Sequence, residues 1–132
     1  TLRCGTDVLI VDGFDGEPII DALVSEEFFC NCRQALSDNG IFVTNWWSGD
    51  KRYQRFVESL LSVFEGRVIE LPAESHGNMA VIAFQNTPKE QNFDKLKKHA
   101  DLISDRYDLN FNRMLTAIKL HNQNNGKTLF LS

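Results

Sequence analysis

Two aspartates near the start of the chain are the residues best suited to do chemistry. Asp12 ends the apolar run D-V-L-I-V-D, and Asp15 follows in a turn that holds Gly13 and Gly16. Carboxylates this close together can converge on one amine, so that one accepts its proton while the other holds a second cationic nitrogen. The simpler interpretation is that Asp15 caps a turn and Asp12 is a solvated strand end. Position and spacing alone leave both interpretations open.

The elements that would position this pair follow a strand and helix alternation. The run Asp7–Asp12 is rich in β-branched residues and does not alternate, which is typical of a central parallel strand buried on both faces. Apolar residues then recur at helical spacing after an N-cap at Ser25, and Asn39–Gly40 is expected to end this helix. A second strand is predicted over Ile41–Trp47, followed by a helix that ends at Gly66. This order indicates a βαβ unit.

The second half of the chain predicts a hairpin and two helices. Arg67–Leu71 and Met79–Gln85 are expected to pair as antiparallel strands, because only a short loop joins them. The capping box T-P-K-E at Thr87 predicts that a helix begins there. A last helix is expected over Asn110–His121, followed by a polar loop. The predicted fold is α/β, a partial doubly wound, Rossmann-like sheet with parallel strands, a C-terminal hairpin and helices on both faces, in a single domain over residues 1–132.

One part of such a fold is missing from the sequence. Doubly wound sheets usually open with a strand and a glycine-rich turn that receives a nucleotide, and neither G-x-G-x-x-G nor a Walker-type loop occurs here. Four strands would also leave the first strand as a bare apolar edge. We therefore expect this chain to be the carboxyl-terminal portion of a domain whose cofactor loop lies upstream or on another chain.

Several motifs in the stretch from Asp7 to Phe84 resemble those of the spermidine and spermine synthases, the polyamine aminopropyltransferases. The motifs are D-V-L-I-V-D-G-F-D-G, S-E-E-F-F, N-G-I-F-V-T-N and L-P-A-E-S-H-G-N-M-A-V-I-A-F. They are similar to the family's D-V-I-I-x-D-S-S-D-P, T-x-E-F-Y, G-x-x-V-x-Q and P-T-Y-P-S-G-x-W-G-F, in the same order. The resemblance implies a methyltransferase-type fold and aminopropyl transfer.

The resemblance also implies roles for particular residues. By position, Asp12 matches the aspartate that takes a proton from the attacking amine, and Asp15 matches the one that binds the polyamine. Asn45 occupies the place of a substrate-side glutamine, and Glu74 that of a tyrosine in the amine pocket. Asp12 and Gly13 would contact the co-substrate, decarboxylated S-adenosylmethionine. A carboxylate base suits this reaction, because only a neutral amine can attack the carbon next to the sulfonium.

Aromatic and imidazole side chains near the same end of the sheet are further candidates. Trp46 and Trp47 follow the second strand, where an aromatic wall could sandwich an amine or an adenine, and Trp46 is the substrate-binding candidate of the two. Core packing is the alternative, and we expect it for at least one of them. His76 lies in the hairpin loop, where a surface position is the simpler expectation.

Departures from the family's motifs concern the amine pocket. Gly16 stands in place of the family's proline, Gly13 and Phe14 in place of two serines, and Ala80 or Val81 in place of the hairpin tryptophan. Three functions therefore stay open. They are aminopropyl transfer to putrescine or a related amine, methyl transfer from S-adenosylmethionine on the same scaffold, and a non-catalytic binding or assembly module.

Composition limits the partners. The chain has 132 residues, of which 42% are hydrophobic, and a net charge of −4, which argues against nucleic acid or an anionic membrane as the main partner and favours a small amine. An odd number of cysteines and no signal-like start indicate reduced thiols and a cytoplasmic protein. The histidines are scattered, so no metal site is expected. No apolar stretch approaches the roughly 20 residues of a membrane helix. The bare first strand predicts a homodimer.

Overall fold

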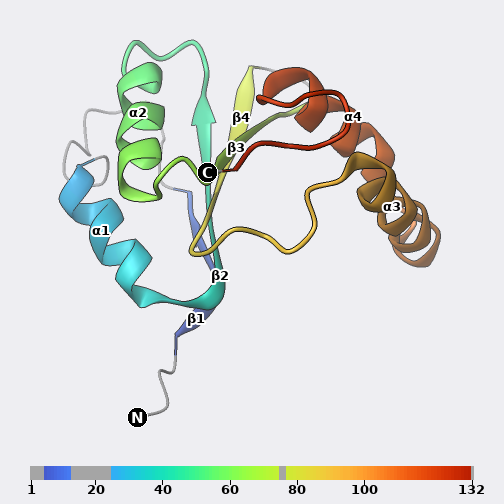
Figure 1. Cartoon of the computed structure of the whole chain (residues 1–132). Coiled ribbons are helices and arrows are strands. Elements are labelled where there is room, and N and C mark those ends of the chain that lie inside the picture. Colours follow the sequence, from blue (N-terminus) through green and yellow to red (C-terminus); the bar gives the residue numbers. More distant parts are fainter. Residues whose placement is uncertain (1–4, 13–24, 75–76, 132) are drawn as a thin grey trace.

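The chain folds as a mixed sheet with helices on both sides. The computed structural model describes residues 5–12, 25–74 and 77–131. In chain order its elements are β1 (Thr6–Val11), α1 (Glu26–Ala35), β2 (Leu36–Trp47), α2 (Tyr53–Val63), β3 (Val68–Pro72), β4 (Asn78–Phe84), α3 (Phe93–Tyr107) and α4 (Phe111–His121). Figure 1 shows α1 and α2 on one face of the sheet and α3 and α4 on the other. The predicted α/β class, with helices on both faces, is confirmed.

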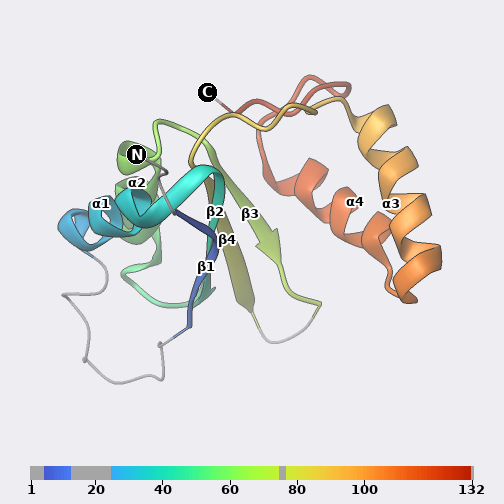
Figure 2. The same ribbon diagram turned by 90° about the horizontal axis from the view of Figure 1, so that it is seen from below.

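The strands form one sheet in the order β1-β2-β4-β3 within the described residues. β1 and β2 are parallel, whereas β4 is antiparallel to both of its neighbours, β2 and β3. β2 and β3 therefore run in the same direction, with α2 as their connection and β4 inserted between them (Figure 2). The predicted antiparallel hairpin is confirmed, and its second strand is the one that joins the rest of the sheet.

An aromatic core lies between the sheet and the helices α1 and α2. Alternate residues of β2 point into it, because successive side chains of a strand face opposite sides. The ring of Phe29 in α1 packs edge-on against Phe42 of β2 and Phe56 of α2, with centroid distances of 6.0 and 5.3 Å. Such pairs contribute about 0.5–1.5 kcal/mol each beyond the area that they bury. These contacts hold both helices on β2.

A smaller core covers the opposite face of β3 and β4. Ile69 of β3 and Phe93 of α3 are buried there together with Leu129 and Leu131 from the end of the chain. The backbone N–H of Phe93 donates to the Lys127 carbonyl at 2.8 Å. The polar loop that we predicted after α4 thus returns to the sheet and adds two buried leucines to this core.

The outer edge of β3 is occupied by one side chain. The amide of Asn122, which follows α4, accepts from the backbone N–H of Glu70 and donates to the carbonyl of the same residue, both at 2.8 Å. It also donates to Ile118 O at 2.9 Å. A single amide therefore satisfies a donor and an acceptor that a neighbouring strand would otherwise take.

The boundary between α1 and β2 differs from the prediction. α1 ends at Ala35, and β2 begins at Leu36, so Asn39–Gly40 lies within the strand and does not end a helix. The pairing of β1 with β2 shifts here, from Thr6 opposite Leu36 to Val8 opposite Ile41. A β-carbon on Gly40 would lie 2.7 Å from the Leu36 β-carbon. The glycine therefore permits a tight irregularity in the strand.

The start of α3 was also predicted wrongly. The helix begins at Phe93, and its N-cap is Asn92, whose side-chain oxygen accepts from the N–H groups of Asp94 and Lys95 at 3.0 and 3.2 Å. The capping-box sequence at Thr87 is not helical. The backbone before the helix instead pairs with the returning end of the chain, since Asn92 forms a bridge with Thr128.

β1 lies at an edge of the sheet among the described residues, as expected for the first of four strands, whereas its predicted burial on both faces is not observed. Leu9 and Val11 pack against the aromatic core, but Val8 and Ile10 on the other face are exposed. Within the part of the chain that the structure describes, β1 pairs with β2 alone. About half of the apolar side chains of β1 therefore stay exposed.

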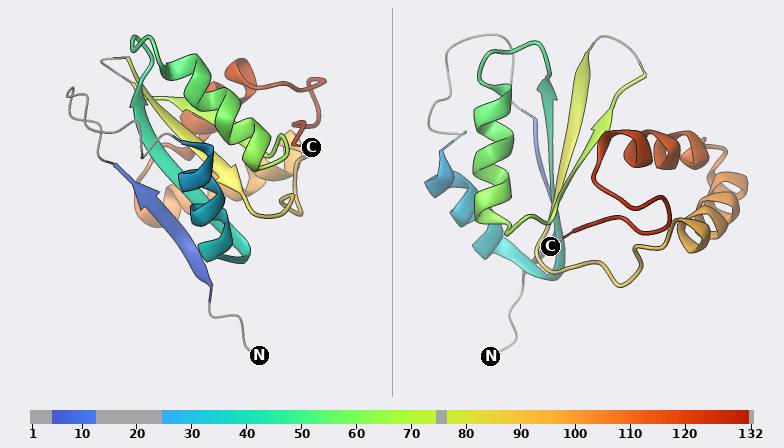
Figure 3. Two further views of the ribbon diagram at one scale, coloured as in Figure 1. Left: turned by 90° about the vertical axis from the view of Figure 1, so that its left-hand side faces the viewer. Right: turned by 45° about the horizontal axis from the view of Figure 1, so that its top comes forward.

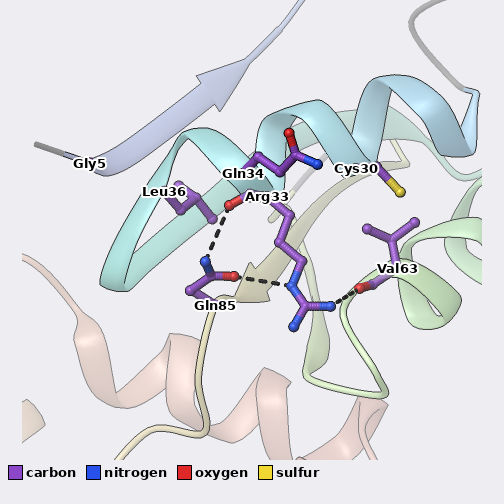
Figure 4. Close-up of a pocket in the computed structure, with 7 residues that line it drawn as sticks. All are labelled: Gly5, Cys30, Arg33, Gln34, Leu36, Val63 and Gln85. Carbon is purple, nitrogen blue, oxygen red and sulfur yellow. Dashed lines mark hydrogen bonds between the residues drawn. The ribbon is translucent and has the colours of Figure 1, made fainter. Parts of the chain in front are cut away.

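Arg33 joins three elements at the end of α2. α2 ends at Val63, and Glu65 and Gly66 then turn the chain with positive φ. The Arg33 guanidinium donates to the Val63 carbonyl and to Gln85 Oε1 at 3.1 Å (Figure 4). It also donates to Glu65 Oε2 at 3.2 Å. The negative end of the α2 helix dipole also stabilises a cation at this position. The side chain thus ties α1 to α2 and to the end of β4.

We expect Arg33→Met to lower the free energy of unfolding by roughly 2 kcal/mol, because methionine keeps the length of the side chain but loses charge-assisted hydrogen bonds. Urea unfolding would measure this change. Arg106→Met, on an exposed turn of α3, is the matched control and should cost less than about 1 kcal/mol. Equal midpoints for the two variants would show that Arg33 does not hold these elements together.

The isolated 132-residue chain should self-associate through β1, since no described strand pairs with the outer edge of β1, where apolar side chains are exposed. Ile10→Lys should shift the chain toward monomer in light scattering. Leu102→Lys on α3 is the matched control, because the two residues are 68% and 70% exposed. A wild-type chain that stays monomeric over the same concentrations would contradict this expectation.

Candidate functional site

Three strand ends meet at one edge of the sheet. β1 and β2 are parallel, Trp47 at the end of β2 pairs with Asn78, and Pro72 at the end of β3 pairs with Met79. The end of β2 and the start of β4 lie on the same side of the molecule in Figure 3. Ligands of open α/β sheets bind beyond this kind of edge. We therefore call it the carboxyl edge and place the candidate site there.

Asp12 and Asn45 lie next to each other at the carboxyl edge. Asp12 comes directly after Val11, the last residue of β1, which pairs with Thr44, so Asp12 is one position beyond the strand and level with Asn45 of β2. Neighbouring strands are about 4.8 Å apart. Asp12 is exposed and Asn45 is half-buried. The structure thus brings together a carboxylate and an amide that the sequence assigned to one site.

Other predicted site residues fall outside the described part of the chain. Gly13, Asp15 and His76 are among these, so the convergence of Asp12 and Asp15 on one ligand stays a prediction.

Glu74 lies at the same edge but away from Asp12. It follows the end of β3, and its carboxylate forms an ion pair with Arg113 of α4, with Oε1 and Nε 3.3 Å apart. β1 and β3 are separated by three strand spacings, or about 14 Å. Asp12 and Glu74 therefore cannot hold the same nitrogen. An exposed ion pair of this kind contributes at most about 1 kcal/mol, so Arg113 could give way to another cation at little cost.

The two tryptophans of β2 face opposite sides of the sheet. Trp46 is only 2% exposed, and its ring stacks on Phe56 at a centroid distance of 4.3 Å, with the Arg52 guanidinium 5.7 Å from its centroid. Trp47 is 58% exposed. The burial of Trp46 favours core packing over the predicted contact with substrate. Its neighbour carries the accessible ring at this edge.

Two glycines leave space for the Trp47 ring. A β-carbon on Gly49 would lie 2.6 Å from Trp47 Cζ2, and one on Gly77 would lie 3.2 Å from Trp47 Nε1. Ser48 joins the two segments, because its N–H and its hydroxyl both donate to the Gly77 carbonyl, at 2.9 and 2.8 Å. The indole is thus held between two stretches of backbone that are themselves hydrogen-bonded.

A partly buried hydrogen bond links the start of α2 to β3. The Tyr53 hydroxyl at the start of α2 donates to Glu70 Oε1 on β3. Burial, followed by the hydrogen bond and the charge of Glu70, raises the pKa of Tyr53 above its ordinary range. The sequence gave no signal for this contact, because Glu70 lies 17 residues after Tyr53 in the chain.

The turn before α2 is fixed by an ion pair. Arg52 donates from Nε and Nη2 to the two carboxylate oxygens of Asp50, at 3.1 and 2.9 Å, and its backbone N–H also donates to Asp50 Oδ1. These hydrogen bonds hold the pKa of Asp50 below its usual value. The pair links the loop that follows Trp47 to the first turn of α2.

The largest cavity that we describe lies at the opposite edge of the sheet. It measures about 640 Å³ and is lined in part by Gly5, Cys30, Arg33 and Gln85 (Figure 4). The guanidinium at its wall already donates to a carbonyl, an amide oxygen and a carboxylate of the protein. This cavity is therefore not part of the predicted site.

Neither a metal cluster nor a membrane helix was found in the part of the chain that the structure covers. The His, Cys, Asp and Glu side chains described there form no group of three or more that could hold a metal ion. None of the described helices is both long and apolar enough to cross a bilayer.

The fold and the carboxyl edge define an α/β protein of the doubly wound class, with a carboxylate where such proteins bind small ligands. Curated proteins named polyamine aminopropyltransferase are similar over almost the whole chain. Those from two strains of Neisseria meningitidis, of serogroups A and B, are 71% identical over 129 residues, and the one from Chromobacterium violaceum is 53% identical over 129 residues. Each alignment covers 98% of this chain and 49% of the relative.

A protein of the same name from Vibrio vulnificus is 31% identical over 86 residues, or 64% of this chain and 29% of the relative. No protein-family model and no solved structure matches the chain. The resemblance seen in the motifs is confirmed, because proteins named polyamine aminopropyltransferase are 71% and 53% identical to this chain over 98% of its length. The chain spans about half the length of the relatives from Neisseria and Chromobacterium.

The raised pKa of Tyr53 makes a prediction about pH. The folded state holds the phenol proton more tightly than the unfolded chain, so this stabilisation is complete below the ordinary tyrosine pKa of about 10 and is lost as the pH rises above it. We expect the free energy of unfolding to fall by up to about 1.4 kcal/mol per pH unit in that window from this group.

Urea unfolding from about pH 8 to about pH 11 would show this loss in the wild type and a shallower loss in Tyr53→Phe. Tyr107→Phe, at an exposed position at the end of α3, is the control and should follow the wild type. If the free energy of unfolding falls equally steeply with pH in all three proteins, the pKa of Tyr53 is the same in the folded and unfolded chain.

Proposed function

We propose that the complete protein transfers an aminopropyl group from decarboxylated S-adenosylmethionine to an amine such as putrescine, with Asp12 as the base. One observation carries the proposal. The chain is 71% identical to proteins named polyamine aminopropyltransferase, and Asp12 follows the β1 residue that pairs with Thr44, which supports a position for Asp12 near Asn45. These are two of the positions that the motifs assign to the reaction.

The chemistry needs little more than a base and correct alignment. Asp12 accepts a proton from the acceptor amine, and the freed lone pair forms a bond to the carbon next to the sulfonium. The bond from that carbon to sulfur breaks, its electron pair returns to sulfur, and a neutral thioether leaves. Exposure of Asp12 at the strand end allows the amine to reach it.

Further side chains would hold the two substrates. In this proposal Asp15 binds the second cationic nitrogen of the amine, Asn45 lies on the substrate side, and Gly13 contacts the co-substrate together with Asp12. Glu74, already paired with the cation Arg113, would meet only the far end of a longer amine. The net charge of −4 is compatible with a cationic substrate and unfavourable for a polyanion.

Asp12→Asn in the complete protein should lower aminopropyl transfer by at least about 100-fold, because the amide cannot accept the proton. Transfer to putrescine would be measured directly. Binding of the co-substrate should survive and would be followed as a rise in melting temperature. Asp7→Asn is the matched control on the same strand, because its amide oxygen can still accept from Ser37 Oγ.

The same assay separates the rival functions. Incubation with S-adenosylmethionine and with its decarboxylated form identifies the group that is transferred. Methyl transfer alone would replace this proposal with a methyltransferase. If neither donor is consumed and neither raises the melting temperature, the protein is a binding or assembly module.

A further inference from the structure

We propose that Trp47 forms a wall of the amine site and binds the cationic acceptor on the face of its indole. This inference rests on the proposed function, and it assigns to Trp47 the aromatic role that the sequence gave to Trp46. Trp46 cannot fill that role from its position in the core. The chemical class of the ligand is an alkylammonium, a cation that the face of an indole ring attracts.

The position of Trp47 relative to Asp12 supports this assignment. Asn45 and Trp47 are two residues apart on β2, so both side chains lie on the face of the sheet away from α1 and α2. Two strand residues span about 6.7 Å. Since Asp12 lies beside Asn45, a carboxylate and an accessible aromatic ring flank the same short stretch of the carboxyl edge. An amine with two nitrogens spaced by methylene groups matches this combination of charge and apolar surface.

The support of the ring is the second argument. Trp47 is 58% exposed, yet a β-carbon on Gly49 would clash with its ring at 2.6 Å and one on Gly77 would lie in tight contact with it at 3.2 Å. The two hydrogen bonds from Ser48 to Gly77 hold the surrounding backbone. A ring that is fixed before binding loses little conformational entropy when a ligand arrives. An exposed tryptophan that served only as loose surface would not need such close glycine contacts.

Steady-state kinetics of the complete protein would test the proposal. Trp47→Ala should raise the KM for putrescine about tenfold, while the KM for decarboxylated S-adenosylmethionine stays within about twofold. Trp47→Phe should recover part of the loss, because a phenyl ring keeps a weaker cation–π contact. Gly49→Ala should give a smaller rise in the same constant, since it displaces the ring without removing it.

Two measurements keep the result independent of folding and of turnover. Melting temperatures show whether the variants are folded, and calorimetric titration with putrescine reports binding even when no transfer occurs. Tyr107→Ala is the control, because Tyr107 is also 58% exposed but lies at the end of α3. It should leave both Michaelis constants unchanged.

The outcomes separate this inference from the proposed function. A wild-type protein that binds putrescine through Trp47 but transfers nothing would reject the function and keep the binding site. An active protein whose KM for putrescine is unaffected in Trp47→Ala would reject the inference alone. A rise confined to the KM of the co-substrate would assign the ring to the nucleoside and also overturn it. A change in oligomeric state with unchanged binding would identify Trp47 as part of an interface, contrary to this proposal.

Discussion

The alternation of side chains along β2 is the constraint on which the rest of the structure depends. Phe42, Thr44 and Trp46 are buried against α1 and α2, and this fixes which way their neighbours must face. Asn45 and Trp47 are consequently held toward the other side at the end of the strand. The aromatic contacts that stabilise the fold thus also set the orientation of the residues that could meet a ligand.

Much of the fold could be predicted because it depends on patterns of residues that are close together in the sequence. The strand and helix alternation up to Gly66, the hairpin and the last helix all depend on periodicity and turn residues that are close together in the chain. The errors arose where distant segments compete with local preference. Thr87 begins a good capping box, but the backbone around Asn92 pairs with Thr128, and a bridge of this kind cannot be seen in a local window.

The candidate site shows the same division. Asp12 was singled out because it ends an apolar strand, and Asn45 because it matches a motif position, and the parallel direction of β1 and β2 then brings the two positions to the same end of the sheet. Trp46 was chosen over Trp47 although a shift of one residue along a strand exchanges the buried face for the accessible one. The contact between Tyr53 and Glu70 could not be predicted, because the sequence around each residue carries no sign of a partner 17 residues away.

The amide of Asn122 restricts the edge at which a further strand can join the sheet. By occupying the N–H and the carbonyl of Glu70, it removes from the outer side of β3 the alternating donors and acceptors that an incoming strand would need. Among the residues described, no side chain occupies the outer backbone groups of β1 in this way. A further strand, from the same polypeptide or a different one, can therefore pair along β1, whereas the Asn122 amide hinders pairing along β3.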